Sequence, residues 1–197
     1  MADPVPTRLP GVIVLCGGTS RRMAGRDKTR EPFAGTTVMD HLLDNLPSDW
    51  DVVCVGERRA TNRQVDWCRE SPVGGGPVAG IATGLEHLAR LGTEICVVLG
   101  GDMPFAGPAM PTLVDALNAR PGLDAVLATD PDGRKQPLLA AYRCGALGKA
   151  LPPEPAGARL MRVIDELVTE TMPFEAQVTL DVDTPEALEQ ARHIVGA

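Results

Sequence analysis

Short apolar runs alternate with longer amphipathic stretches along most of the chain. The apolar runs are five or six residues long and predict buried strands at residues 11–16, 51–55, 94–99, 125–129, 138–142 and 178–182. Apolar positions at helical spacing predict helices at residues 36–46, 78–90, 108–119, 158–168 and 185–194. Because strands mostly alternate with helices, the pattern predicts an α/β fold whose mostly parallel sheet carries helices on both faces.

One stretch departs from this alternation. Pro131-Asp132-Gly133 is a turn signal between two apolar runs, so residues 129–142 predict a small antiparallel excursion in the sheet. The chain of 197 residues shows no internal repeat or linker, and its length suits one core. We therefore expect a single Rossmann-like three-layer domain at residues 11–197, preceded by a flexible, proline-containing tail at residues 1–10.

Composition narrows the functional classes. Aromatic residues make up only 3% of the chain, so the core must be largely aliphatic. The net charge of −7 argues against a nucleic-acid-binding protein, which usually presents a basic surface. No apolar run approaches the roughly 18 residues of a membrane span. The five cysteines form no Cys-x-x-Cys pair, which favours free thiols in a reducing compartment. We therefore expect a cytoplasmic protein without nucleic-acid or membrane partners.

The most informative segment, residues 15–28, directly follows the first predicted strand. It reads Leu-Cys-Gly-Gly-Thr-Ser-Arg-Arg-Met-Ala-Gly-Arg-Asp-Lys. Glycines let backbone N–H groups approach an anion, and the cationic side chains neutralise its charge. The spacing matches neither the G-x-G-x-x-G dinucleotide fingerprint nor the G-x-x-x-x-G-K-(S/T) phosphate loop. The segment predicts another kind of nucleoside triphosphate site, and a glycine turn beside solvated cations is the alternative.

Two later segments lie where predicted strands end or helices begin. Gly76-Pro77-Val78-Ala79-Gly80 opens a predicted helix whose first N–H groups can donate to a ligand, although Gly-Pro turns are also common for structural reasons alone. Asp102 follows the predicted strand at 94–99, where a carboxylate either binds Mg²⁺ or caps a turn. Ligands of open α/β sheets bind beyond the carboxyl ends of the strands. The position of both segments therefore favours a binding site.

Two segments further along the chain carry additional polar residues. Asp181 and Asp183 alternate in and just after the predicted strand 178–182, so both should face one side and suit a metal or a cationic partner. Thr184 can cap the last helix, with Pro185 in its first turn, whatever the two carboxylates do. Gln136 and Pro137 follow the predicted turn and either contact a ligand or belong to an ordinary hairpin.

These segments occur in the order found in one enzyme family. Residues 15–28 resemble the signature Leu-x-Gly-Gly-x-Ser-x-Arg-Met-Gly-x-Asp-Lys of the molybdenum cofactor guanylyltransferases (the MobA family). Residues 76–80 resemble its Gly-Pro-Leu-Ala-Gly segment, and residues 102–105 its Asp-x-Pro-(Phe/Tyr) segment. The resemblance implies transfer of GMP from GTP to the terminal phosphate of molybdenum–molybdopterin, which gives molybdopterin guanine dinucleotide and pyrophosphate, with Mg²⁺ as cofactor.

The resemblance also implies roles for individual residues. Lys28 and Arg22 would neutralise the triphosphate and the developing charge, and Asp102, with Asp183 as a second candidate, would hold Mg²⁺. The implied acceptor-binding residues are Gln136, Pro137, Asp181 and Asp183. The implied nucleotide-binding residues are Leu15, Cys16, Gly17, Gly18, Ser20, Lys28, Glu70, Gly76, Pro77, Gly80 and Asp102. Glu70 is selected from the stretch 56–71, which matches the family poorly.

Several alternatives remain at this stage. The sequence departs from the family pattern because Cys16 replaces an alanine, Ala24 adds a small residue, and Thr29-Arg30 replaces apolar residues. One alternative is a cytidylyltransferase of the same cofactor, and another is a nucleotidyltransferase for a sugar or alcohol phosphate. Gly17 favours the guanylyl members, because cytidylyl members usually have Leu-Ala-Ala-Gly.

A third alternative, from another class, is a nucleotide-binding assembly protein without turnover. The joint presence of Lys28 and Asp102 argues against it, because a protein that only binds a nucleotide needs no metal-binding aspartate. The resemblance implies GTP and a molybdopterin-type acceptor as binding partners. Molybdoenzymes or cofactor-insertion proteins are further expected partners.

Overall fold

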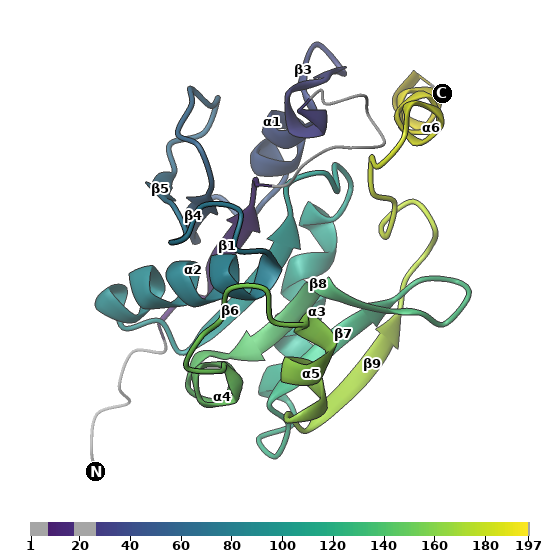
Figure 1. Cartoon of the computed structure of the whole chain (residues 1–197). Helices are drawn as coiled ribbons and strands as arrows, with labels where there is room; N and C mark the ends of the chain where they lie inside the picture. Colours follow the sequence, from purple (N-terminus) through teal and green to yellow (C-terminus); the bar gives the residue numbers. More distant parts are fainter. Residues whose placement is uncertain (1–7, 18–26, 197) are drawn as a thin grey trace.

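A seven-stranded sheet forms the centre of the molecule, in a computed structural model that describes residues 8–17 and 27–196 (Figure 1). Its strands are β1 (Gly11–Leu15), β4 (Asp51–Val55), β5 (Asp66–Cys68), β6 (Ile95–Gly100), β7 (Ala125–Thr129), β8 (Lys135–Arg143) and β9 (Thr169–Pro173). They lie in the order β5-β4-β1-β6-β8-β7-β9. Only β8 runs against its neighbours, because it pairs antiparallel with both β6 and β7. This arrangement confirms the predicted excursion at residues 129–142.

Helices cover both faces of the sheet, which makes three layers. Helices α1 (Val38–Asp44) and α3 (Met110–Asn118) pack on one face, and α2 (Pro77–Leu91), α4 (Cys144–Ala150) and α5 (Leu160–Asp165) pack on the other. The alternation within β1 explains the two cores, since Val12 and Val14 belong to one buried cluster and Ile13 to the other. Both clusters are aliphatic in the main, as the low aromatic content predicts.

The last helix, α6 (Pro185–Gly196), belongs to a third, smaller cluster. In it Val182 and Leu188 pack with Phe33 of the short hairpin formed by β2 (Pro32–Phe33) and β3 (Thr36–Thr37). Arg192 ties the helix to this hairpin by donating to the Pro32 carbonyl at 2.7 Å. In Figure 1, α6 lies on the side of the sheet toward which β1 and β6 point. The C-terminal segment is therefore anchored beside the predicted site.

Helix α2 packs unusually close to the sheet because glycines face β1. A Cβ atom at Gly84 would lie 2.5 Å from Ile13 Cγ2, and one at Gly80 would lie 2.9 Å from Leu15 Cδ2. The helix begins after Gly76, whose φ of 88° and ψ of 179° suit glycine, with Pro77 as its first residue. It ends at Gly92, in the left-handed conformation typical of a helix C-terminus.

One predicted strand was wrong, and some elements were not predicted. Residues 178–182 are not a strand: Val178 and Thr179 donate backbone hydrogen bonds to Glu175 in a turn, and Val182 packs into the third cluster. The edge strand on that side is β9 instead. The structure also has α4 and β5, which the hydrophobic pattern did not indicate, because α4 contains two glycines and β5 is only three residues long.

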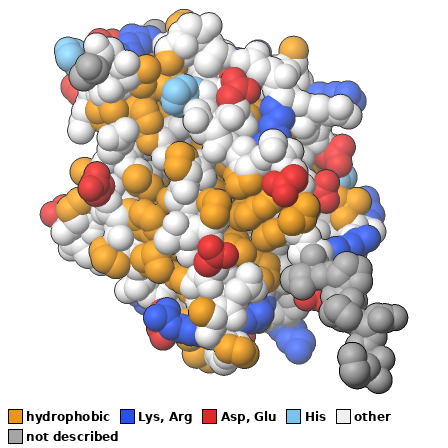
Figure 2. Space-filling model, turned by 180° about the vertical axis from the view of Figure 1, so that it is seen from behind, with side chains coloured by type: hydrophobic (Ala, Val, Ile, Leu, Met, Phe, Trp, Pro, Cys, Tyr) orange, Lys and Arg blue, Asp and Glu red, His pale blue; other side chains and the backbone are white. Residues whose placement is uncertain are grey.

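One face of the molecule carries a mixture of hydrophobic, acidic and basic side chains (Figure 2). Figure 2, which views the molecule from behind, shows hydrophobic side chains between polar ones across the middle of this face, with Lys and Arg side chains mainly toward its margins. Within the described part of the chain, no helix is both long and apolar enough to cross a bilayer.

Candidate active site

The parallel strands β1, β4 and β6 end side by side, and the ends of β1 and β6 bring two of the singled-out segments together. Leu15 is paired with Val55 on one side and Gly100 on the other. The backbone contacts continue past the strands, because Cys16 donates to the Val55 carbonyl and Gly101 donates to the Leu15 carbonyl, both at 2.9 Å. Asp102 consequently lies two residues beyond the end of β6, at the sheet edge that also carries the start of the glycine-rich segment.

Three carboxylates converge at this edge. One side-chain oxygen from each of Asp102, Asp181 and Asp183 lies within 4.8 Å of the others. The segment 181–183 is held there by Val182, which is buried and donates its N–H to the Asp102 carbonyl at 2.9 Å. The expectation that both late aspartates face one side is met in a loop rather than in a strand. Hard oxygen donors in this arrangement fit Mg²⁺ or Mn²⁺.

Lys28 supplies the positive charge among these carboxylates. Its amino group forms ion pairs with Asp102 and Asp183, and its side chain is only 21% exposed. Burial lowers the pKa of Lys28, but the charges and hydrogen bonds of the two aspartates outweigh burial and raise the pKa above its ordinary value. The group is therefore a permanent cation at neutral pH.

The carboxylates repel one another despite this cation. Asp181 is exposed on one side, yet partial desolvation and the neighbouring charges of Asp183 and Asp102 raise its pKa. Gly100 makes room for the cluster, because a Cβ atom there would lie 2.4 Å from Asp102 Oδ1. An additional cation at this position would relieve the repulsion, which is the electrostatic condition for a metal site.

Lys28 begins a short 3₁₀ turn, Lys28–Arg30. Asp27 caps the turn by accepting from the Thr29 N–H at 3.0 Å and from the Thr29 hydroxyl at 2.6 Å. Partial burial raises the pKa of Asp27, but the Thr29 hydrogen bonds and the charges of Arg59 and Arg30 outweigh it and lower the pKa. Asp27 is therefore ionised at neutral pH, and the turn is fixed on both sides of Lys28.

Arg59 is a site residue that the sequence analysis missed. It follows β4 within the stretch 56–71, its side chain is 12% exposed, and it forms an ion pair with Asp27 at 2.9 Å. Its guanidinium also lies over the Trp67 ring, 5.9 Å from the centroid. An arginine just past a buried strand was a usable signal, but the stretch gave no motif with which to separate it from Arg58.

The loop before α2 lies on the other side of Leu15. The Glu70 carboxylate accepts from the Gly74 N–H at 3.0 Å, and the same oxygen lies 3.8 Å from the position of a Cβ on Gly17. Glu70 thus lies between the end of β1 and the loop that leads to Gly76. Pro77 and Gly80 open α2 beside Leu15, so the predicted nucleotide-binding residues in the described part of the chain surround one end of β1.

The remaining predicted residues either lie on β8 or fall outside the described part of the chain. Gln136 and Pro137 begin the antiparallel strand β8, which pairs with β6 through Leu99 and Leu139, and so they lie at the same sheet edge as Asp102. Gln136 contacts Asp130 at 3.4 Å. Gly18, Ser20 and Arg22 lie outside the described residues, and the roles implied for them stay predictions.

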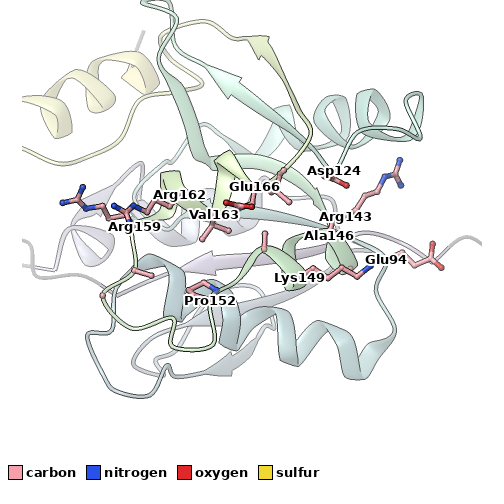
Figure 3. A pocket seen from close by; sticks show the side chains of 15 residues that line it. Glu94, Asp124, Arg143, Ala146, Lys149, Pro152, Arg159, Arg162, Val163 and Glu166 are labelled. Carbon is pink, nitrogen blue, oxygen red and sulfur yellow. The ribbon is translucent and has the colours of Figure 1, made fainter.

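A wide hollow lies away from this edge, between α4 and α5 (Figure 3). Basic and acidic side chains both line it, namely Arg143, Lys149, Arg159, Arg162, Glu94, Asp124 and Glu166. In Figure 3 Arg159 and Arg162 lie together on one side, while Arg143, Lys149 and Glu94 lie on the other. The hollow contains none of the residues predicted for the site, and its mixed charge favours no single ligand.

Comparisons with known proteins identify relatives of similar sequence. A probable molybdenum cofactor guanylyltransferase of Natronomonas pharaonis is 30% identical over 91% of this chain and 95% of that protein. A second probable molybdenum cofactor guanylyltransferase, from Methanosarcina acetivorans, is 32% identical over 71% of this chain and 66% of that protein.

Two solved structures share the fold. The crystal structure of molybdopterin-guanine dinucleotide biosynthesis protein A from Archaeoglobus fulgidus has a TM-score of 0.74 and 23% identity, with 94% of this chain and 98% of that chain covered. A manganese complex of Rv0371C from Mycobacterium tuberculosis has a TM-score of 0.64 and 17% identity, with 93% of this chain and 97% of that chain covered.

The sequence model of the MobA-like NTP transferase domain matches residues 12–171. The chain therefore belongs to the MobA-like NTP transferase family of nucleotidyltransferases.

Proposed function

We propose that the protein transfers GMP from GTP to the terminal phosphate of a molybdopterin-type acceptor. The observation that carries the proposal is the convergence of Lys28 with three carboxylates at the sheet edge that also carries the glycine-rich segment. The family membership and the relatives named as guanylyltransferases support the same reaction.

In this reaction an oxygen of the acceptor phosphate attacks the α-phosphorus of GTP. A new P–O–P bond forms while the bond between the α-phosphorus and the bridging oxygen to the β-phosphate breaks, and pyrophosphate leaves with that electron pair. The attacking phosphate is already ionised at neutral pH, so no general base is required. The protein must instead bring two anions together and neutralise the charge that accumulates on the leaving group.

The chain's own residues suit this task. Lys28, held in its charged form, would contact the triphosphate, and Arg22 is the second cation that we assign to it. Asp102, with Asp181 and Asp183, would hold Mg²⁺, which supplies Lewis-acid neutralisation of phosphate oxygens. Backbone groups around Leu15 and the start of α2 would line the base and ribose.

Calorimetric titration of the purified protein with GTP and with CTP, each with Mg²⁺, tests the nucleotide. We expect clear preference for GTP, and preference for CTP would place the protein among cytidylyltransferases. A turnover assay with molybdenum–molybdopterin then tests the acceptor. Pyrophosphate release that requires GTP, Mg²⁺ and this acceptor together is the expected result. Release with a sugar phosphate instead, or none with any acceptor, would contradict the proposal.

A further inference from the structure

Arg59 reaches from the end of β4 to the turn that carries Lys28. One guanidinium nitrogen donates to Asp27 Oδ2 at 2.9 Å, and another donates to the Thr29 hydroxyl. Asp27 and Thr29 are the two chain neighbours of Lys28. A single side chain from another part of the sheet edge therefore holds the backbone on both sides of the predicted triphosphate-binding lysine.

The surroundings of Arg59 restrict its own movement. Its guanidinium lies over Trp67 and touches the Met39 sulfur, while Thr29 is only 4% exposed. A planar guanidinium can address two acceptors in a fixed geometry, whereas a lysine ammonium acts as a point charge on a flexible stem. The neighbouring Arg58 is exposed, so two adjacent arginines have different environments.

We propose that Arg59 is a positioning residue that directs the Lys28 amino group toward the reacting phosphates. It fixes the Asp27–Thr29 backbone relative to β4. Because β4 pairs with β1, and β1 in turn pairs with β6, this backbone is also fixed relative to Asp102. Arg59 itself contacts no substrate in this proposal. The inference rests on the proposed function only for the role of Lys28, because the contacts of Arg59 are independent of the reaction.

Chemical modification tests the positioning without any substrate. The sequence contains three lysines, Lys28, Lys135 and Lys149, and the last two are exposed. Acetylation with a small amine reagent, resolved by mass spectrometry, should modify Lys28 more slowly than the other two in the unaltered protein. In Arg59→Ala its rate should rise toward theirs, and in Arg58→Ala it should stay low. An unchanged Lys28 rate in Arg59→Ala would overturn the proposal.

Kinetics then test the consequence for catalysis. Misplacement of a catalytic group by about 1 Å costs up to roughly 100-fold in rate, so Arg59→Ala should lower kcat about 10- to 100-fold. The KM for GTP should change far less, and Arg59→Lys should recover part of kcat because one acceptor can still be reached. Arg58→Ala is the matched control. A raised KM with unchanged kcat would show that Arg59 binds the nucleotide itself and would overturn positioning.

A second route covers the case in which Arg59→Ala does not fold. Thr29→Val keeps the shape of the buried side chain but removes the hydroxyl that accepts from Arg59. This variant should therefore also have a lower kcat, as expected for Arg59→Ala. The effects of Thr29→Val and Arg59→Lys should be less than additive, because both weaken one contact. Full additivity would contradict a shared role. If the unaltered protein shows no turnover with GTP, the proposed function fails, while the acetylation result still decides the role of Arg59.

Discussion

At the scale of single residues, the site depends on a cation and carboxylates that meet across the fold. Lys28 and Asp183 are separated by 155 positions in the chain, yet they form an ion pair. Because the two residues lie so far apart in the chain, their ion pair can form only once the fold has brought the two segments together. Asp102 also forms an ion pair with Lys28 and belongs to the same carboxylate cluster as Asp183.

Replacement of Asp102 by alanine should abolish metal-dependent nucleotidyl transfer while the protein stays folded. The reason is that Asp102 belongs to the carboxylate cluster and pairs with Lys28, whereas its side chain is only partly buried and is not part of the core. Pyrophosphate release and circular dichroism provide the two measurements. The exposed Asp132 offers a control as Asp132→Ala, and near-normal turnover of Asp102→Ala would remove Asp102 from the mechanism.

Lys28 should compete with a metal ion when no nucleotide is present. Its amino group contacts two of the three carboxylates, so a divalent cation among them is repelled at short range. Replacement by methionine should therefore tighten binding of Mn²⁺ alone by roughly tenfold or more, since charges near a protein surface interact by a few kcal/mol. Electron paramagnetic resonance of free Mn²⁺ measures this, with Lys135→Met as control. Equal affinity in Lys28→Met and the unaltered protein would place the metal elsewhere.

At the scale of elements, helix α2 shows how a site loop is positioned by packing. Because Gly80 and Gly84 face β1 without side chains, the helix axis approaches the sheet closely. The N-terminus of α2, with Gly76 and Pro77, consequently lies against the end of β1 rather than a side-chain layer above it. The two glycines thus set the depth of the predicted nucleotide site.

A methyl group at Gly84 should destabilise the protein even though alanine favours helices. The added Cβ would lie 2.5 Å from Ile13 Cγ2 in a packed core, and overpacking of this kind typically costs about 1–3 kcal/mol. Gly145→Ala in α4 is the matched control, because nothing lies within 4 Å of its Cβ position and helix propensity there favours alanine by up to about 1 kcal/mol. In urea unfolding, the midpoint should fall for Gly84→Ala and rise for Gly145→Ala. An unchanged midpoint in Gly84→Ala would contradict the packing argument.

The elements that sequence reasoning predicted well are those with internal signals. Helix α2 has Pro77 at its start, Gly92 at its end and a regular apolar face, so its bounds were confirmed within one residue. The segment 178–182 lacked such a check, because Leu180 and Val182 pack with α6 and a distant hairpin instead of a neighbouring strand. Arg59 was missed for a related reason, since its partners Asp27 and Thr29 lie about thirty positions earlier.

At the scale of the whole molecule, a bound nucleotide should stabilise the folded state by contacting several separate segments of the chain. GTP with Mg²⁺ would contact Lys28, Asp102 and the loop before α2 at once. At a free concentration 100-fold above Kd, a ligand that binds only the folded state adds about 2.7 kcal/mol. For a domain of this size that raises Tm by roughly 5–11 °C. Differential scanning fluorimetry measures the shift, and chelation of the metal should remove most of it.

Matched samples with CTP and Mg²⁺ provide the control for this prediction. A smaller shift with CTP is expected if the base is read at the start of α2. Equal shifts with both nucleotides would mean that the phosphates alone determine binding, and no shift with either would argue against a nucleoside triphosphate site at this edge.

The order in which the site is assembled along the chain has a consequence for protein synthesis. All seven strands of the sheet precede residue 174, whereas Asp181, Asp183 and α6 follow it. A nascent or truncated chain that stops after β9 contains every strand and the Lys28 turn, but only one of the three carboxylates. Such a fragment would contain much of the predicted nucleotide site without the complete carboxylate cluster that would hold the metal. Synthesis of the residues that follow β9 would thus complete the reactive site, and shorter products would not consume the triphosphate.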